Sequence, residues 1–139
     1  MFLATNTDAA LPSSQGRELP GINCTKTGAG AMIAAVKAAS LREPVIVGKP
    51  SPKMFDVIKT ILDVDPATTC MVGDRIETDI KFGNDCGMKT VLVMSGVTSH
   101  QSYQMLEREC SKGVESVKHV FSKPTFISET LYDLVLRLQ

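Results

Sequence analysis

The chain has 139 residues, of which 43% are hydrophobic and 22% are charged, and this balance suits one globular domain with a buried core. Fifteen basic residues match fifteen acidic ones, so no net charge draws the protein to nucleic acid or to an anionic membrane surface. The sequence has neither a basic leader nor a long apolar segment, and we therefore expect a cytoplasmic protein that does not span a membrane.

The cysteines predict no metal or redox site. No two of the four have the C-x-x-C spacing of such sites. Cys70 and Cys86 lie within apolar patterns, where a free thiol behaves as a small hydrophobic side chain. We expect all four to be reduced, which fits a cytosolic protein: Cys24, Cys70, Cys86 and Cys110.

The first forty residues predict a strand, a loop and a helix. "MFLATNTD" resembles a strand that runs into a turn, and because it starts at residue 1 we expect the chain to be cut from a longer protein. Residues 9–28 are rich in Pro, Ser, Gly and Asn and are expected to form a loop. The Ala-rich segment "GAGAMIAAVKAAS" then predicts a short helix.

A strand and a second helix follow. "PVIVGKP" predicts a short buried strand that ends at Gly48. Ser51 is a suitable N-cap and Pro52 a suitable first residue for the helix in "SPKMFDVIKTIL". Three apolar residues are expected to share one face of this helix: Phe55, Ile58 and Leu62.

The remaining elements continue the alternation of strands and helices. A strand is predicted at 69–73, and a helix over 77–86 that stops at Gly87. "KTVLVMSG" predicts the next strand. A helix at 102–110, a strand at 117–121 and a final helix from residue 128 complete the chain.

This order of elements predicts an α/β fold. Strands that alternate with helices and are almost continuously apolar are typical of a Rossmann-like parallel sheet covered by helices on both faces. In such sheets ligands bind beyond the carboxyl ends of the strands. Lys49, Asp74 and the segment "SGVTS" all follow predicted strands, so we expect them at that edge.

These polar residues suit a phosphate site. The carboxylates of Asp74 and Asp79 are suitable ligands for Mg²⁺, which binds few protein groups and keeps several waters. Lys49 precedes a helix whose free N–H groups favour anions. Simpler roles stay open at this point: Asp79 as a first-turn acid, Asp74 as a helix cap and Lys49 as a surface lysine.

The motifs around these residues resemble a known family. "VGKPSPKMF", "MVGDRIETDI" and "FGNDCGMKTVLVMSGV" closely resemble the haloacid dehalogenase (HAD) superfamily, and within it the branch of 4-nitrophenylphosphatases, phosphoglycolate phosphatases and pyridoxal phosphate phosphatases. "FLATNTD" and "GRELPG" resemble the end of the large α/β cap domain of that branch. The resemblance implies a cap remnant over residues 1–43 and the C-terminal part of the core domain over residues 44–139.

The resemblance also implies roles for single residues. Lys49 would be the catalytic lysine that orients the nucleophile and neutralises phosphoryl oxygens. Asp74 would bind Mg²⁺, and Asp79 would support the metal site without being a direct ligand. Three further residues belong to these two motifs: Gly48, Gly73 and Ser51. The glycines would keep the backbone close at the two sites, and Ser51 would help to bind phosphate.

The implied function is that of a Mg²⁺-dependent phosphoric monoester hydrolase. Such enzymes act on small phosphorylated metabolites through an aspartyl-phosphate, and the parent enzyme could be a homodimer. Their nucleophile belongs to a D-x-D-G motif that this chain lacks, so the 139 residues alone are expected to be inactive. Asp63 and Asp65 form a D-x-D, but Pro66 follows, and the resemblance makes this a helix-to-strand connection. The alternative is a non-catalytic truncated isoform or paralogue that acts as a binding or dimerisation partner.

Overall fold

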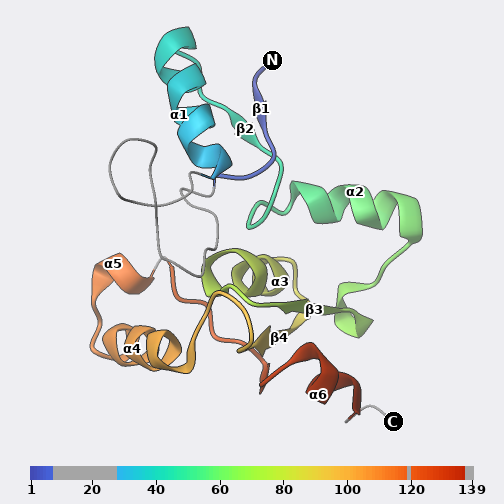
Figure 1. Cartoon of the computed structure of the whole chain (residues 1–139). Coiled ribbons are helices and arrows are strands. Elements are labelled where there is room, and N and C mark those ends of the chain that lie inside the picture. The colour runs from blue at the N-terminus through green and yellow to red at the C-terminus, as the bar shows by residue number, and fades with distance from the viewer. Residues whose placement is uncertain (8–27, 119, 137–139) are drawn as a thin grey trace. The chain divides into compact units, whose positions relative to one another are not determined.

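The computed structural model describes residues 1–7, 28–118 and 120–136 (Figure 1). Its contacts divide the chain into two compact units, Met1–Met54 and Phe55–Gln139, called unit 1 and unit 2 below. The boundary between cap and core that the sequence suggests, at residues 43 and 44, stays a prediction. Most of the loop predicted for residues 9–28, with Cys24, lies outside the described residues.

Unit 1 contains a parallel pair of short strands and one helix. β1 (Leu3–Ala4) pairs with β2 (Val45–Ile46), and α1 (Ala29–Ser40) forms where the Ala-rich segment predicted a helix. β2 is shorter and more exposed than predicted, because Val45 keeps 38% of its surface exposed. Among the described residues β2 pairs with β1 alone, so it is not the buried strand that an apolar run suggests.

Helix α2 (Lys53–Leu62) begins one residue after the predicted start. Phe55 is buried and packs edge-on against Phe82, with ring centroids 6.3 Å apart. Leu62, which was expected on the same face of the helix as Phe55, keeps 66% of its surface exposed. The contact between Phe55 and Phe82 anchors α2 near its first turn, and the last turn of the helix extends beyond this contact.

The sheet of unit 2 has three parallel strands in the order β3–β4–β5. They are β3 (Cys70–Gly73), β4 (Lys89–Val93) and β5 (Phe126–Ser128). All residues of β4 except Lys89 are buried, as expected for a central strand with a continuous apolar sequence. Together with the helices that alternate with these strands (Figure 1), the sheet confirms the predicted α/β class.

The turn after β3 leads into two short helices. A π-helical turn, η2 (Ile76–Ile80), is followed by α3 (Lys81–Asp85), which lies against β3 and β4. The single predicted helix over 77–86 is therefore two helices of different type. The chain then turns at Gly87, whose φ of +76° is a left-handed conformation that glycine adopts without strain.

The segment between β4 and β5 departs from the prediction. α4 (His100–Ser111) starts with a capping box between Ser99 and Ser102, two residues before the predicted start. The strand predicted at 117–121 is wrong: α5 (Glu115–Lys118) occupies its start, and Val117 is buried there.

β5 takes the place of that strand beside β4. Thr90 and Thr125 exchange hydrogen bonds between main-chain N–H and hydroxyl groups at 3.1 and 2.9 Å, and these fix the start of the β4–β5 pair. The sequence did not predict β5. The final helix, α6 (Leu131–Leu136), follows it.

The core of unit 2 lies directly behind the turn after β3. Ile76, Ile80 and Leu92 are 0% exposed and form one cluster with Tyr103 of α4. Burial raises the pKa of the Tyr103 hydroxyl, and the nearby Glu107, whose carboxylate accepts its hydrogen bond, raises it further. Ile76 and Ile80 are the first and last residues of η2, so both ends of this turn are anchored in the core.

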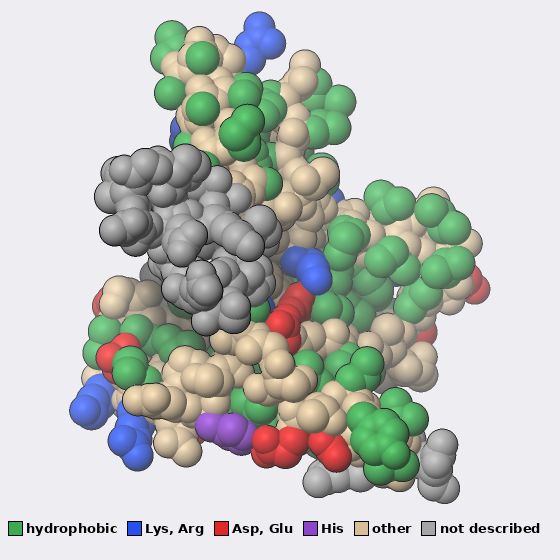
Figure 2. All heavy atoms as spheres, viewed as in Figure 1, with side chains coloured by type: hydrophobic (Ala, Val, Ile, Leu, Met, Phe, Trp, Pro, Cys, Tyr) green, Lys and Arg blue, Asp and Glu red, His purple; other side chains and the backbone are tan. Residues whose placement is uncertain are grey.

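Hydrophobic side chains also reach the surface over α1 and α2 (Figure 2). On α1 they include Met32 and Val36, and on α2 Val57 and Ile61. In the described parts of the chain, no helix combines the length and the apolar character needed to cross a membrane.

Candidate functional site

Asp74 follows the last residue of β3 and is held by the loop after β4. Its Oδ2 accepts a hydrogen bond from the main-chain N–H of Val97 at 2.9 Å. Its carbonyl oxygen accepts another from the N–H of Thr98, also at 2.9 Å. Because the two strands are parallel, their carboxyl ends meet at one edge of the sheet, and these bonds join them there.

Asp79 lies in the π-helical turn and is only 5% exposed. Its Oδ2 accepts hydrogen bonds from the main-chain N–H groups of Asp74 and Arg75, each at 3.1 Å. The N–H groups of Asp79 and Ile80 both donate to the carbonyl of Arg75, and this turn brings the carboxylate back to the start of η2. Asp79 therefore braces the backbone that carries Asp74.

Two glycines let these groups approach so closely. A Cβ on Gly73 would overlap the side chain of Asp79, and a Cβ on Gly96 would overlap the carboxylate of Asp74. Both positions therefore need a residue without a side chain. Gly73 was among the predicted site residues, and it lies where the prediction requires it.

Gly96, Val97 and Thr98 are the residues that the sequence analysis missed. It placed the segment "SGVTS" at the edge of the sheet but assigned no role to its members. Val97 and Thr98 act through main-chain N–H groups, which every residue except proline has, so their types carry no signal. Gly96 was the one available hint, since a glycine just after a strand can indicate a close approach of another group.

Lys49, Gly48 and Ser51 belong to unit 1 and form a compact turn after β2. A Cβ on Gly48 would overlap the carbonyl of Thr5, next to β1. The N–H of Ser51 donates to the carbonyl of Gly48 at 3.0 Å. The peptide bond between Lys49 and Pro50 is cis. These three predicted site residues are thus neighbours, as Asp74 and Asp79 are in unit 2.

The acids suit a hard cation with few protein ligands. Hydrogen bonding occupies one oxygen of Asp74, and no hydrogen bond from a described residue reaches its Oδ1. A free carboxylate oxygen suits a Mg²⁺ ion, which keeps several waters and binds only one or two carboxylates of a protein. No group of three or more His, Cys, Asp or Glu side chains that could hold a metal ion occurs among the described residues.

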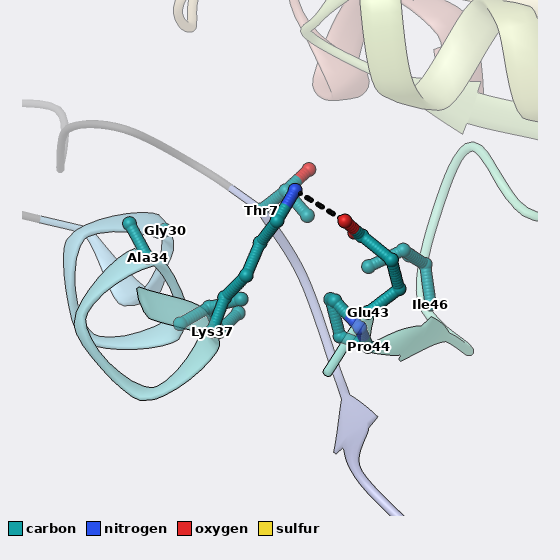
Figure 3. Close-up of a pocket in the computed structure, with 8 residues that line it drawn as sticks. Thr7, Gly30, Ala34, Lys37, Glu43, Pro44 and Ile46 are labelled. Carbon is teal, nitrogen blue, oxygen red and sulfur yellow. Dashed lines mark ion pairs between the residues drawn. The ribbon is translucent and has the colours of Figure 1, made fainter. Parts of the chain in front are cut away.

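A separate pocket of about 310 Å³ lies within unit 1 (Figure 3). It lies between α1 and the segment that leads into β2, and two of its lining residues, Lys37 and Glu43, form an ion pair of 2.8 Å. Its remaining lining is mostly apolar or small: Thr7, Gly30, Ile33, Ala34, Pro44 and Ile46. None of the predicted site residues lines it, and its two charges offset each other.

Comparison with known families gives two matches. A haloacid dehalogenase-like hydrolase model matches residues 1–87, and a HAD-hydrolase-like model matches residues 46–134. Each of these spans more than half of the chain.

Individual proteins give the same result. Mouse chronophin is 48% identical over 104 residues, which are 75% of this chain and 33% of chronophin. The crystal structure of a 4-nitrophenylphosphatase from Thermotoga maritima shares the fold with a TM-score of 0.68 and 31% identity, over 96% of this chain and 43% of that enzyme. A glycerol phosphate phosphatase from Mycobacterium tuberculosis, solved in complex with magnesium, has a TM-score of 0.68 at 28% identity, over 96% of this chain and 34% of that protein. The chain thus spans about a third of the length of mouse chronophin and of the chicken glycerol-3-phosphate phosphatase, to which it is also similar.

Proposed function

The chain belongs to the haloacid dehalogenase-like hydrolases, and on this basis we propose that it supplies the cation-binding and phosphate-binding part of a Mg²⁺-dependent phosphatase. The observation that carries the proposal is the convergence of Asp74 and Asp79 at the carboxyl end of β3, where hydrogen bonds to the backbone orient both. Preorganised charge of this kind is the main contribution of a protein to phosphoryl transfer.

Each site residue has a distinct role in the proposal. Asp74 holds the cation through Oδ1, and Asp79 keeps the backbone of Asp74 in place. Lys49 orients the nucleophile and neutralises phosphoryl oxygens, with Ser51 as a further phosphate contact and Gly48 as the close-packed turn before it. When bound, Mg²⁺ would neutralise negative charge on the phosphoryl group.

The nucleophile is proposed to come from outside these 139 residues. In the family mechanism an aspartate oxygen bonds to phosphorus while the ester P–O bond breaks and the alcohol leaves with a proton; water then hydrolyses the aspartyl-phosphate to inorganic phosphate. The D-x-D of this chain does not suit that role. Asp65 instead caps the 3₁₀ turn η1 (Pro66–Thr68), because its Oδ1 accepts a hydrogen bond from the N–H of Ala67 at 2.9 Å.

The domain division, the substrate class, the compartment and the oligomeric state are part of the same proposal. We assign residues 1–43 to the end of a cap domain and residues 44–139 to the core domain. Small phosphorylated metabolites in the cytoplasm are the proposed substrate class, and a homodimer is the proposed state of the parent enzyme. The proposal rests on the motifs around Lys49 and Asp74. These motifs serve the reaction and do not determine which substrate is bound.

The test is a chimera in which this chain replaces the matching segment of the Thermotoga maritima enzyme. We expect the chimera to hydrolyse 4-nitrophenyl phosphate when Mg²⁺ is present, and the matched Asp74→Asn chimera to lose that activity. The 139-residue chain alone should be no more active than its own Asp74→Asn variant.

Two results would contradict the proposal. A chimera that folds, as judged by circular dichroism, but has no activity would favour the non-catalytic partner instead. Activity of the isolated chain that Asp74→Asn abolishes would show that it contains its own nucleophile, and Asp63 and Asp65 would then have to be tested.

A further inference from the structure

We infer that the loop of Gly96, Val97 and Thr98 positions the metal-binding carboxylate, in that the N–H of Val97 holds Oδ2 of Asp74 and thereby presents Oδ1 to the cation. This inference rests on the proposed function, because it takes Asp74 as the Mg²⁺ ligand. It adds a positioning element from the loop that follows β4 to a site that the sequence motif places after β3.

Two hydrogen bonds fix Asp74 to this loop at separate points. The N–H of Val97 binds the side chain and that of Thr98 binds the main-chain carbonyl, both at 2.9 Å. A carboxylate that is held at one oxygen and at its own backbone cannot rotate freely about its side-chain bonds. The free oxygen is therefore aimed in one direction before a cation arrives.

The loop is itself held at both ends. On one side the N–H of Met94 donates to the carbonyl of Ser128 at 3.0 Å, which continues the β4–β5 pairing. On the other side Ser99 caps α4, and Thr98 before it is only 5% exposed. The donor at Val97 is thus a fixed group, although 41% of the Val97 surface is exposed.

Gly96 supplies an independent indication of the same contact. Its Cα lies so close to Asp74 that a Cβ would overlap the carboxylate. The loop therefore lies directly against this side chain, and any side chain at residue 96 must displace it. Groups that orient a metal ligand typically change metal affinity about 10- to 100-fold when they are removed.

The experiment measures Mg²⁺ binding directly, without activity. The full 139-residue chain is labelled with ¹⁵N, and the amide resonances of Asp74 and Arg75, which every variant keeps, are followed during a Mg²⁺ titration. We expect saturable shifts that the Asp74→Asn variant loses. Val97→Pro, which removes the N–H donor, should weaken binding about tenfold or more.

Val114→Pro is the matched control. Val114 is 39% exposed, precedes a helix as an exposed loop residue, and its N–H donates to the carbonyl of Glu109 at 3.2 Å. Its replacement removes one main-chain hydrogen bond away from Asp74, so we expect unchanged Mg²⁺ affinity. A purely structural role of the Val97 N–H would make the two proline variants alike in affinity.

A second variant, Gly96→Ala, keeps every N–H and displaces the carboxylate, and we expect it to weaken Mg²⁺ binding too. If the NMR spectrum of Val97→Pro shows that this variant does not fold, Gly96→Ala tests the inference in its place. Loss of binding in Asp74→Asn with wild-type affinity in both loop variants would overturn the inference and leave the proposed function standing. Absence of saturable binding in the wild-type chain, or binding that Asp74→Asn retains, would overturn both.

Discussion

The two units hold their site residues in different ways. In unit 2, Asp74 is fixed by hydrogen bonds from two directions, and behind it lie Ile76 and Ile80, both 0% exposed. In unit 1, Lys49 follows a two-stranded sheet, and Ala4 is the one buried hydrophobic residue among those described. An isolated pair of strands is only marginally stable in water. The hydrogen bonds described for Asp74 and Asp79 thus lie within unit 2. The following variants test this difference between the two units.

The largest expected effect is from Leu92→Ala in the core of unit 2. Leu92 is 0% exposed and belongs to the same core cluster as both isoleucines of the turn that carries Asp79. Its truncation leaves a cavity, and we expect the free energy of unfolding to fall by about 2–5 kcal/mol. Urea denaturation followed by circular dichroism measures the change.

Val36→Ala on α1 is the control in unit 1. Val36 is 47% exposed on a helix that has no buried residue, and we expect its truncation to change stability by no more than about 0.5 kcal/mol. If both variants lost the same stability, α1 would be packed as firmly as the core of unit 2, and the contrast between the units would be wrong.

A smaller loss is expected from Asp79→Ala. The substitution leaves the N–H groups of Asp74 and Arg75 without this acceptor in a partly buried turn, which costs about 1–3 kcal/mol. Asp79→Asn keeps one side-chain oxygen in place and should cost less. Thermal or urea unfolding of the three proteins gives the order, and an alanine variant as stable as the wild type would show that Asp79 does not brace the turn.

Much of this arrangement could be predicted from the sequence because its signals are local. β3 and β4 are continuous apolar runs, and α1 is rich in alanine, so their type was evident from composition and spacing. Asp74 and Asp79 could be singled out because they follow a strand, where parallel sheets gather their ligands. The structure brings this pair together.

What could not be predicted depends on partners distant in sequence. The segment from 117 to 121 has the β-branched residues of a strand, but the N–H groups of Val117 and Lys118 bind the carbonyl of Val114, and the edge of β4 is taken by β5 instead. The contact of Val97 with Asp74 spans 23 positions and uses a main-chain donor. No residue type encodes such a bond.

The smallest expected effect is from Glu43→Gln in unit 1, which removes one charge of the ion pair with Lys37. The two groups are 2.8 Å apart, but their side chains are 50% and 77% exposed. Water and salt screen such a pair, so its loss should change stability by no more than about 1 kcal/mol, and by less at high salt. Asp85→Asn is the matched control, because Asp85 pairs with Lys81 in unit 2 at the same 2.8 Å with both side chains partly exposed. Urea unfolding at low and high salt should give similar small losses for both variants. A loss from Glu43→Gln as large as that from Asp79→Ala would mean that unit 1, like unit 2, relies on a fixed polar contact, and the difference between the two units would then lie in their cores alone.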